Sequence, residues 1–140
     1  MIRRAVIIDT NVVVAGLLTA HNTSPVSRIL DGMLRAAFPF VVSEALLAEY
    51  RTVLVRPALR KLHGLSNSEV ETFLTDIVQH AIVLAPLAAP PAPDPGDQLL
   101  WALLAARDDL VLVTGDKLLL QDATLKGRVI SPQAFEAGTA

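Results

Sequence analysis

Four acidic residues are spread along the chain at places where a strand or a helix could aim a carboxylate at one shared point. They are Asp9, Glu49, Asp97 and Asp116. Two carboxylates about 4 Å apart repel each other by roughly 4 kcal/mol at an effective dielectric constant near 20. A cluster of four needs a compensating positive charge, and hard divalent cations such as Mg²⁺ or Mn²⁺ prefer oxygen ligands. If these side chains converge, the sequence predicts a metal-dependent enzyme.

Two of the acidic residues follow short apolar runs. Residues 5–8 are apolar and end at Asp9, while residues 110–113 precede Thr114, Gly115 and Asp116. Continuous apolar runs of this length are typical of strands that are buried on both faces of a parallel sheet. The functional crevice of such sheets lies outside the carboxyl ends of the strands, so we expect Asp9 and Asp116 to meet there.

The order of the remaining elements predicts an α/β fold. Apolar runs predict about five strands, at residues 5–8, 40–42, 82–84, 110–113 and 129–130. Helical patterns alternate with these strands, which favours a mostly parallel central sheet with helices on both faces. A length of 140 residues without an internal repeat predicts a single domain over residues 1–140.

Capping residues predict where the helices begin. Helix starts are expected at Ser24-Pro25, Ser43, Ser66 and Asp94-Pro95. The second of these helices carries Glu49 and ends or kinks at Pro57. The last carries Asp97 in its first turn, and Asp94 itself is interpreted as a structural cap. We expect a polar loop between Asp9 and the Ser24 cap.

Composition and charge restrict the partners. The chain has no cysteine, which excludes disulfides and thiolate zinc sites. The formal net charge is −2, so a nucleic acid would have to be held by a local basic patch or by metal ions. The basic residues of segment 51–61 are Arg51, Arg56, Arg60 and Lys61, without an acid among them. A solvated helix face is the commoner explanation of such a run, and RNA contact is the alternative.

A membrane location is not expected. Arg3 and Arg4, followed by apolar residues, resemble the start of a secretory signal, but the polar triplet at residues 9–11 interrupts this pattern. The longest continuous apolar run, at residues 99–106, is far shorter than the ~20 residues that cross a bilayer. We therefore predict a cytoplasmic protein that makes no contact with a membrane.

The segments around the four acids resemble those of the PIN-domain nucleases, particularly the toxins of toxin-antitoxin pairs. The resemblance lies in residues 6–12 (VIIDTNV), 43–50 (SEALLAEY), 94–97 (DPGD) and 113–117 (VTGDK). Asp-Thr-Asn alone is common, but four such segments in the order and spacing of the family make a strong joint signal. Gly96 and Leu118 depart from the family pattern, because these positions often carry a further acid, and this leaves the number of bound metal ions open.

The resemblance implies hydrolysis of RNA phosphodiester bonds with Mg²⁺ or Mn²⁺ as the cofactor. It implies that the metal ligands are Asp9, Glu49, Asp97 and Asp116. Asn11 and Thr114 would orient the carboxylates by hydrogen bonds. Candidate RNA contacts are Arg51, Arg56 and Lys117. A toxin also implies a cognate antitoxin protein that restrains it, and the resemblance further suggests a homodimer.

Two other functions stay open at this level. A PIN-like module that has lost activity would bind RNA with metal but not cut it, and Gly96 and Leu118 are compatible with that alternative. A haloacid dehalogenase-like phosphatase would use an aspartate nucleophile, and Asp9 stands where such a residue would be. Those phosphatases usually place a second aspartate two residues later, where this sequence has Asn11.

Overall fold

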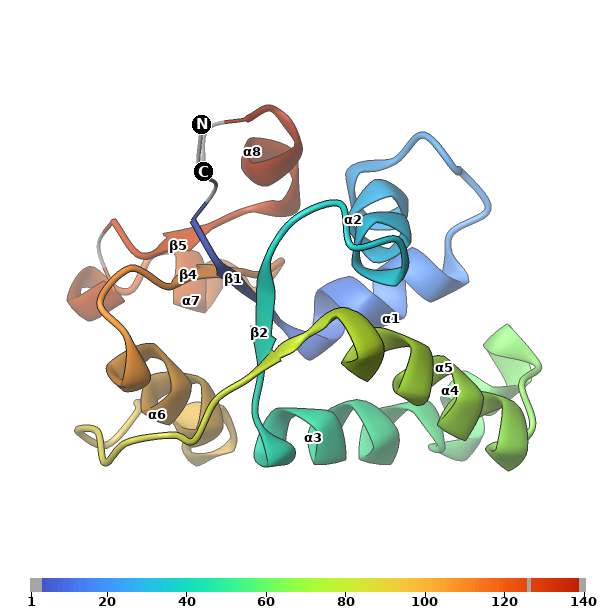
Figure 1. Cartoon of the computed structure of the whole chain (residues 1–140), viewed down its shortest axis with the longest axis horizontal. Coiled ribbons are helices and arrows are strands. Elements are labelled where there is room, and N and C mark those ends of the chain that lie inside the picture. Colours follow the sequence, from blue (N-terminus) through green and yellow to red (C-terminus); the bar gives the residue numbers. More distant parts are fainter. Residues whose placement is uncertain (1–3, 126, 139–140) are drawn as a thin grey trace.

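A five-stranded sheet forms the centre of the molecule (Figure 1). The computed structural model describes residues 4–125 and 127–138, so Arg3 of the signal-like segment lies outside it. The strand order is β3-β2-β1-β4-β5, and all four strand pairings are parallel. The strands are β1 (Val6–Ile8), β2 (Phe40–Val42), β3 (Ile82–Val83), β4 (Val111–Val113) and β5 (Val129–Ile130). The predicted α/β fold with about five strands is confirmed.

Helices connect successive strands. Between β1 and β2 lie α1 (Thr10–Leu18) and α2 (Pro25–Leu34), and between β2 and β3 lie α3 (Glu44–Leu54), α4 (Pro57–His63) and α5 (Asn67–His80). The connection to β4 contains the 3-10 turn η1 (Pro95–Asp97) and α6 (Gln98–Ala106). Around β5 are α7 (Lys117–Leu120), the 3-10 turn η2 (Ala123–Leu125) and α8 (Pro132–Glu136). No helix in the described part of the chain is long and apolar enough to cross a membrane.

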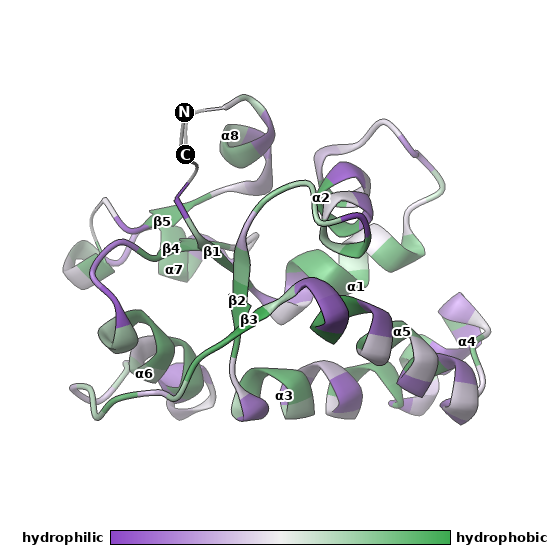
Figure 2. Cartoon of the chain, viewed as in Figure 1, coloured by the Kyte–Doolittle hydropathy of each residue, from purple (hydrophilic) through white to green (hydrophobic). Residues whose placement is uncertain are grey.

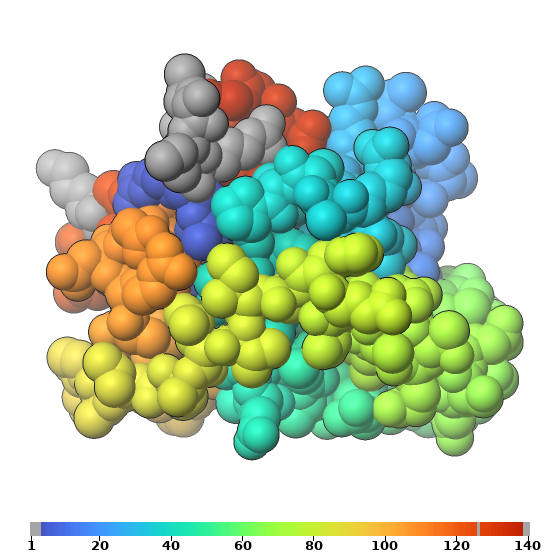
Figure 3. Space-filling model, in the orientation of Figure 1, coloured from blue at the N-terminus to red at the C-terminus, as the bar shows by residue number. Residues whose placement is uncertain are grey.

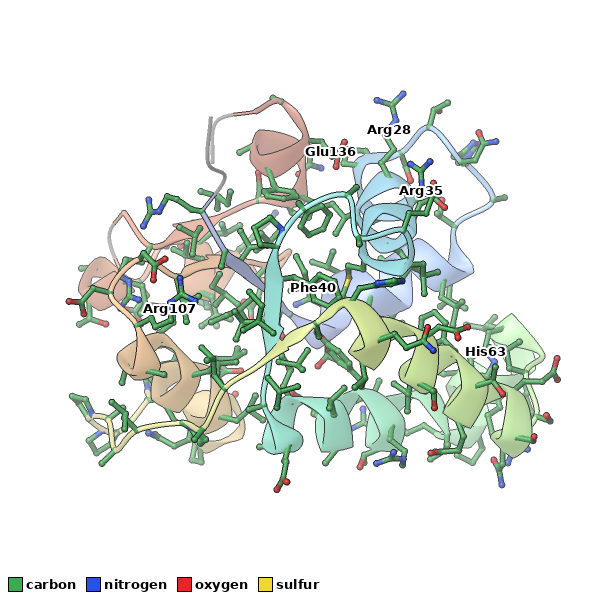
Figure 4. The ribbon with its side chains drawn as sticks, in the orientation of Figure 1. Arg28, Arg35, Phe40, His63, Arg107 and Glu136 are labelled. Atoms are coloured by element: carbon green, nitrogen blue, oxygen red, sulfur yellow. The ribbon has the colours of Figure 1, made fainter. Side chains whose placement is uncertain are left out.

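The three central strands are buried along their whole length. Every residue of β1, β2 and β4 is buried, whereas both residues of the edge strand β3 are exposed. Phe40 of β2 lies inside this core (Figure 4). Figure 2 shows hydrophobic residues concentrated on the strands and α6, with hydrophilic residues on α4 and the outer side of α5. In the space-filling view, α5 and the segment after it cover the lower middle of the face shown, beside segments from other parts of the chain (Figure 3).

The predicted polar loop after Asp9 is wrong, because α1 begins directly at Thr10. Valines and other apolar residues follow one another in this segment, which hides the spacing of an amphipathic helix. The helix packs against α2, α3 and α4. A glycine allows the close approach of α2, since a Cβ atom on Gly16 would lie 2.6 Å from the carbonyl oxygen of Val26.

Other helix boundaries follow the capping residues. Ser24, Ser43 and Ser66 each accept a backbone N–H three residues later, and Glu69 completes the capping box of α5. Helix α3 ends at Leu54, and Pro57 starts α4 as a separate helix. The helix predicted from Asp94 begins instead with η1, and α6 starts three residues after Pro95.

Candidate active site

The site lies where the strand order changes direction. From β1 the chain adds β2 and β3 on one side, and it then crosses back to add β4 and β5 on the other. The ends of β1 and β4 are adjacent, because Ile8 pairs with Val113. A ligand crevice is expected at such a switch point, outside the carboxyl ends of the strands. Asp9 follows β1 at this edge, and Thr114 follows β4.

All four acidic residues line one cavity at this edge, with a volume of about 370 Å³. Asp9 comes from the end of β1, Glu49 from α3, Asp97 from the end of η1 and Asp116 from the turn after β4. The other lining residues are Thr10, Asn11, Val14, Val53 and Arg56. Asp9 and Asp116 are 107 positions apart in the sequence, yet they line the same cavity.

Hydrogen bonds fix the Asp9 carboxylate. Its Oδ1 accepts the backbone N–H of Thr10 at 2.8 Å. Its Oδ2 accepts the hydroxyl of Thr114 at 2.8 Å and the side-chain amide of Asn11 at 3.3 Å. The Asn11 amide is held in turn, because its Oδ1 accepts the backbone N–H of Gly115 at 3.0 Å. Asn11 and Thr114 thus both donate hydrogen bonds to the Asp9 carboxylate.

The remaining acids differ in how their carboxylates are used. Oδ1 of Asp116 accepts the backbone N–H of Leu118 at 2.9 Å, so this residue caps α7 as well as lining the cavity. Asp97 is the N-cap residue of α6 but makes no side-chain capping bond. Asp94 accepts the backbone N–H of Gly96 at 2.8 Å, as expected for a structural cap. The Asp97 carboxylate is therefore not used to cap α6.

The carboxylates disfavour one another's charge. Burial raises the pKa of Asp9, its hydrogen bonds from Thr114 and Thr10 lower it, and the charges of Glu49 and Asp116 raise it further. Burial, followed by the charges of Asp9, Asp94 and Asp116, raises the pKa of Asp97 to about 6. A positive charge placed between these carboxylates would favour their ionised forms.

One basic side chain, Arg56, is among the described residues that line the cavity. It is exposed and forms no ion pair with the carboxylates there. Arg51 points elsewhere, since its guanidinium donates to both carboxylate oxygens of Glu71 at 2.7 and 3.1 Å. Lys117 is exposed at the start of α7 but does not line the cavity.

Other arginines lie well away from the site. Arg28 of α2, Arg35 directly after that helix and Glu136 of α8 lie together at one end of the molecule, where they line a different cavity (Figure 4). Arg107, which follows α6, is paired with Asp109 and lies apart from this group, at the left of the view (Figure 4). Arg56 is therefore the best placed of these arginines to meet a ligand in the acidic cavity.

The residues of the cavity suit a hydrated hard cation. In the described residues, no three acidic, histidine or cysteine side chains form a ready-made metal cage. Mg²⁺ does not require one, because it usually keeps several waters and is bound through one or two carboxylates. Thr10 lines the cavity, and its hydroxyl is buried and has no hydrogen-bond partner among the described residues. A water in the shell of a bound cation would satisfy it, so the oxygen-only donor set fits.

Comparison with known proteins places this geometry in a family. The family model described as the PIN domain matches residues 5–118, which include all four acidic positions. The chain belongs to the PIN domain family. This is a nuclease-type family of hydrolases that typically use divalent metal ions, which agrees with the acidic cavity of this PIN domain. No curated protein matches the chain.

Sequence reasoning overlooked Thr10 as a residue of the site. It stands between two residues that were singled out, Asp9 and Asn11, but the expected loop gave its hydroxyl no defined direction. As the first residue of α1, Thr10 is fixed against the cavity by the capping bond to Asp9. An N-cap aspartate followed by threonine was the available signal for this arrangement.

Proposed function

We propose that this PIN domain is a metal-dependent endoribonuclease that hydrolyses RNA phosphodiester bonds, and that it acts as the toxin of a toxin-antitoxin pair. The observation that supports the proposal is the meeting of four carboxylates in one cavity, where burial and the charges of neighbouring acids raise the pKa values of Asp9 and Asp97. Membership of a nuclease-type family favours phosphodiester chemistry over the phosphatase alternative.

The proposed metal ligands, directly or through bound water, are Asp9, Glu49, Asp97 and Asp116, with Mg²⁺ or Mn²⁺ as the cation. When bound, the cation supplies a water of lowered pKa and stabilises charge on the scissile phosphate. Thr114 and Asn11 hold the Asp9 carboxylate in place through hydrogen bonds to its Oδ2. The Thr10 hydroxyl has a free hydrogen-bonding capacity, with which it would hold and orient a water in the cavity.

The basic residues have separate proposed roles in binding RNA. Arg56 lines the cavity and forms no ion pair with an acid in the described part of the chain, so its guanidinium is available for two parallel hydrogen bonds to a phosphate next to the scissile one. Lys117, exposed beside Asp116, would contact the RNA backbone at the rim. Arg51 would have to break its ion pair with Glu71 to bind RNA, so we rank it below Arg56 and Lys117 as an RNA contact.

The same charges define the proposed antitoxin. An acidic cavity that lacks a cation attracts a basic side chain, so an antitoxin segment with an arginine or lysine would occupy it in place of metal and RNA. Expression of the chain alone should then arrest growth of its host, whereas Asp9→Asn should not. Co-expression with the antitoxin protein should restore growth and yield a stable complex. For the free toxin we also propose a homodimer.

Cleavage of a mixed RNA pool tests the enzymatic proposal. Mg²⁺, Mn²⁺ and a chelator are compared for the wild type, for Asp9→Asn and for Asp76→Asn, a control at an exposed acid of α5 outside the cavity. We expect cleavage by the wild type and by the control only when metal is present, and none by Asp9→Asn. Cleavage in chelator, or by Asp9→Asn, overturns the proposal. RNA that is bound with metal but never cut favours the non-catalytic alternative.

A further inference from the structure

Tyr50 is buried directly beside the proposed metal site, yet the mechanism above does not use it. Its side chain is fully buried in α3, and its hydroxyl donates a hydrogen bond to the backbone carbonyl of Ile8. A phenylalanine would fill the same space without the cost of burying a hydroxyl. The bond joins two residues that each stand next to a proposed ligand, since Ile8 precedes Asp9 and Tyr50 follows Glu49.

The bond completes the fixation of one peptide group. The N–H of Asp9 donates to the carbonyl of Val113 in β4 at 3.0 Å, while the carbonyl of the same Ile8–Asp9 peptide accepts from Tyr50. The neighbouring strand on the other side is no longer available here, because the β1–β2 pairing ends at Ile7 and Val41. Tyr50 therefore takes the place of a strand N–H at the point where the chain leaves β2 for α3.

We propose that Tyr50 is a positioning residue that sets the separation of the Asp9 and Glu49 carboxylates through its hydrogen bond to Ile8. Asp9 is carried by β1 and Glu49 by α3, and this hydroxyl joins the two elements one residue away from each carboxylate. Without it, α3 would still be held in the core by Leu46 and Leu54, which are fully buried. The two carboxylates would then lose their fixed spacing. The inference rests on the proposed metal-dependent function.

Mn²⁺ binding to the full chain tests this role, without RNA, by titration calorimetry. Tyr50→Phe removes one oxygen atom, and Leu54→Val is the control that perturbs the same buried face of α3 one turn later. Residues that support metal ligands typically contribute 10- to 100-fold to metal affinity. We expect Tyr50→Phe to weaken Mn²⁺ binding about tenfold or more. We expect Leu54→Val to bind Mn²⁺ with close to the wild-type affinity, even if its melting temperature falls by as much as that of Tyr50→Phe.

A second measurement keeps the native hydroxyl. The chain contains a single tyrosine, so incorporation of 3-fluorotyrosine gives one ¹⁹F signal that reports Tyr50 alone. We expect this signal to shift on addition of Mg²⁺, with the same half-saturation as metal binding. The result stays decisive if Tyr50→Phe does not fold.

The outcomes separate the two proposals. Equal Mn²⁺ affinity of Tyr50→Phe and wild type, equal weakening by Leu54→Val, or a ¹⁹F signal that ignores saturating Mg²⁺ overturns the role of Tyr50 and leaves the nuclease proposal standing. A wild type that binds Mn²⁺ but never cuts RNA overturns the nuclease proposal, and the affinities still decide the role of Tyr50. A wild type that binds no Mn²⁺ overturns both.

Discussion

The hydroxyl of Thr114, at the carboxyl end of β4, donates a 2.8 Å hydrogen bond to Oδ2 of Asp9, at the carboxyl end of β1. The two residues are 105 positions apart in the sequence. The same hydroxyl accepts the backbone N–H of Asp116 at 3.0 Å. One fully buried side chain thus links two of the four carboxylate-bearing positions, and the sheet itself holds this part of the site in place.

Replacing this hydroxyl should weaken metal binding. Thr114→Val keeps the side-chain volume but removes a hydrogen bond to a charged group, which is worth about 1.5–3 kcal/mol. The pKa of Asp9 should rise further, because that bond lowers it. We expect calorimetry to show Mn²⁺ affinity reduced by a factor on the order of ten or more. Thr72→Val, at an exposed position of α5, is the control, and unchanged affinity in Thr114→Val contradicts the assigned role.

Thr10→Val should have opposite effects on stability and on metal binding. The buried hydroxyl of Thr10 has no hydrogen-bond partner in the described part of the chain, which costs about 1 kcal/mol or more in the metal-free protein. The isosteric valine should therefore raise the free energy of unfolding in chelator. It should also reduce the stabilisation that Mn²⁺ provides, because the hydroxyl can no longer hold a water of the cation. Chemical denaturation with and without Mn²⁺ measures both, and a loss of stability in chelator would speak against an unpartnered hydroxyl.

Asp97 should make the metal-free protein less stable as the pH rises. Burial and the neighbouring charges raise its pKa from 3.8 to about 6, so the folded state binds its proton more firmly than the unfolded state does. This contribution to stability is complete below the unfolded pKa of 3.8 and is lost as the pH passes through about 6. Denaturation in chelator between about pH 4 and 7 should show a smaller loss for Asp97→Asn than for the wild type. Parallel curves for the two proteins would disprove the shift.

Metal dependence should show the reverse trend with pH. A cation binds the deprotonated carboxylates, so Mn²⁺ affinity should increase as the pH rises through the pKa of Asp97, about 6, and level off above it. Calorimetric titrations at several pH values check this in the wild type. An affinity that is independent of pH in this range would exclude Asp97 as a ligand.

Arg56→Gln should affect RNA and leave metal binding unchanged. The guanidinium is exposed at the cavity and makes no ion pair with the described carboxylates, so its loss removes a phosphate contact without breaking a bond within the site. We expect the KM for RNA to rise several-fold, the salt dependence of binding to become weaker, and the Mn²⁺ affinity to stay constant. Arg60→Gln, an exposed neighbour in α4 outside the cavity, is the matched control. An equal rise in KM for both variants would indicate a nonspecific charge effect.

The sheet and the meeting of Asp9 with Asp116 at its edge could be predicted from the sequence because both depend on local signals. The apolar runs before Asp9 and Thr114 identify buried parallel strands, and the strand order then brings their carboxyl ends together. Glu49 could not be assigned to the site from local signals, since nothing in its own helix distinguishes it from an exposed residue. Its place in the cavity depends on the packing of α3 beside β1, which was expected through the family resemblance.

The first helix could not be predicted in the same way. Residues 10–18 carry apolar side chains on all sides, so their pattern has no polar face to mark a helix, and only the packing of α1 against neighbouring helices explains it. The start of α6 was misplaced for a related reason. Asp94-Pro95 is a good helix start, but here it begins a 3-10 turn, which leaves the Asp97 carboxylate uncommitted. The start of α1 at Thr10 and the 3-10 turn before α6 both differ from the predicted elements, and they place Thr10 and Asp97 in the site.

The claim that the carboxylates repel one another until a divalent cation joins them is tested most directly by melting curves of the wild type and Asp9→Asn, with Mn²⁺ and with chelator. In chelator, Asp9→Asn should be at least as stable as the wild type, because burial and the charges of Glu49 and Asp116 disfavour the ionised Asp9. Mn²⁺ should raise the melting temperature of the wild type and leave that of Asp9→Asn nearly unchanged. A wild type that does not respond to Mn²⁺, or an Asp9→Asn variant that is unfolded in chelator, would contradict the account.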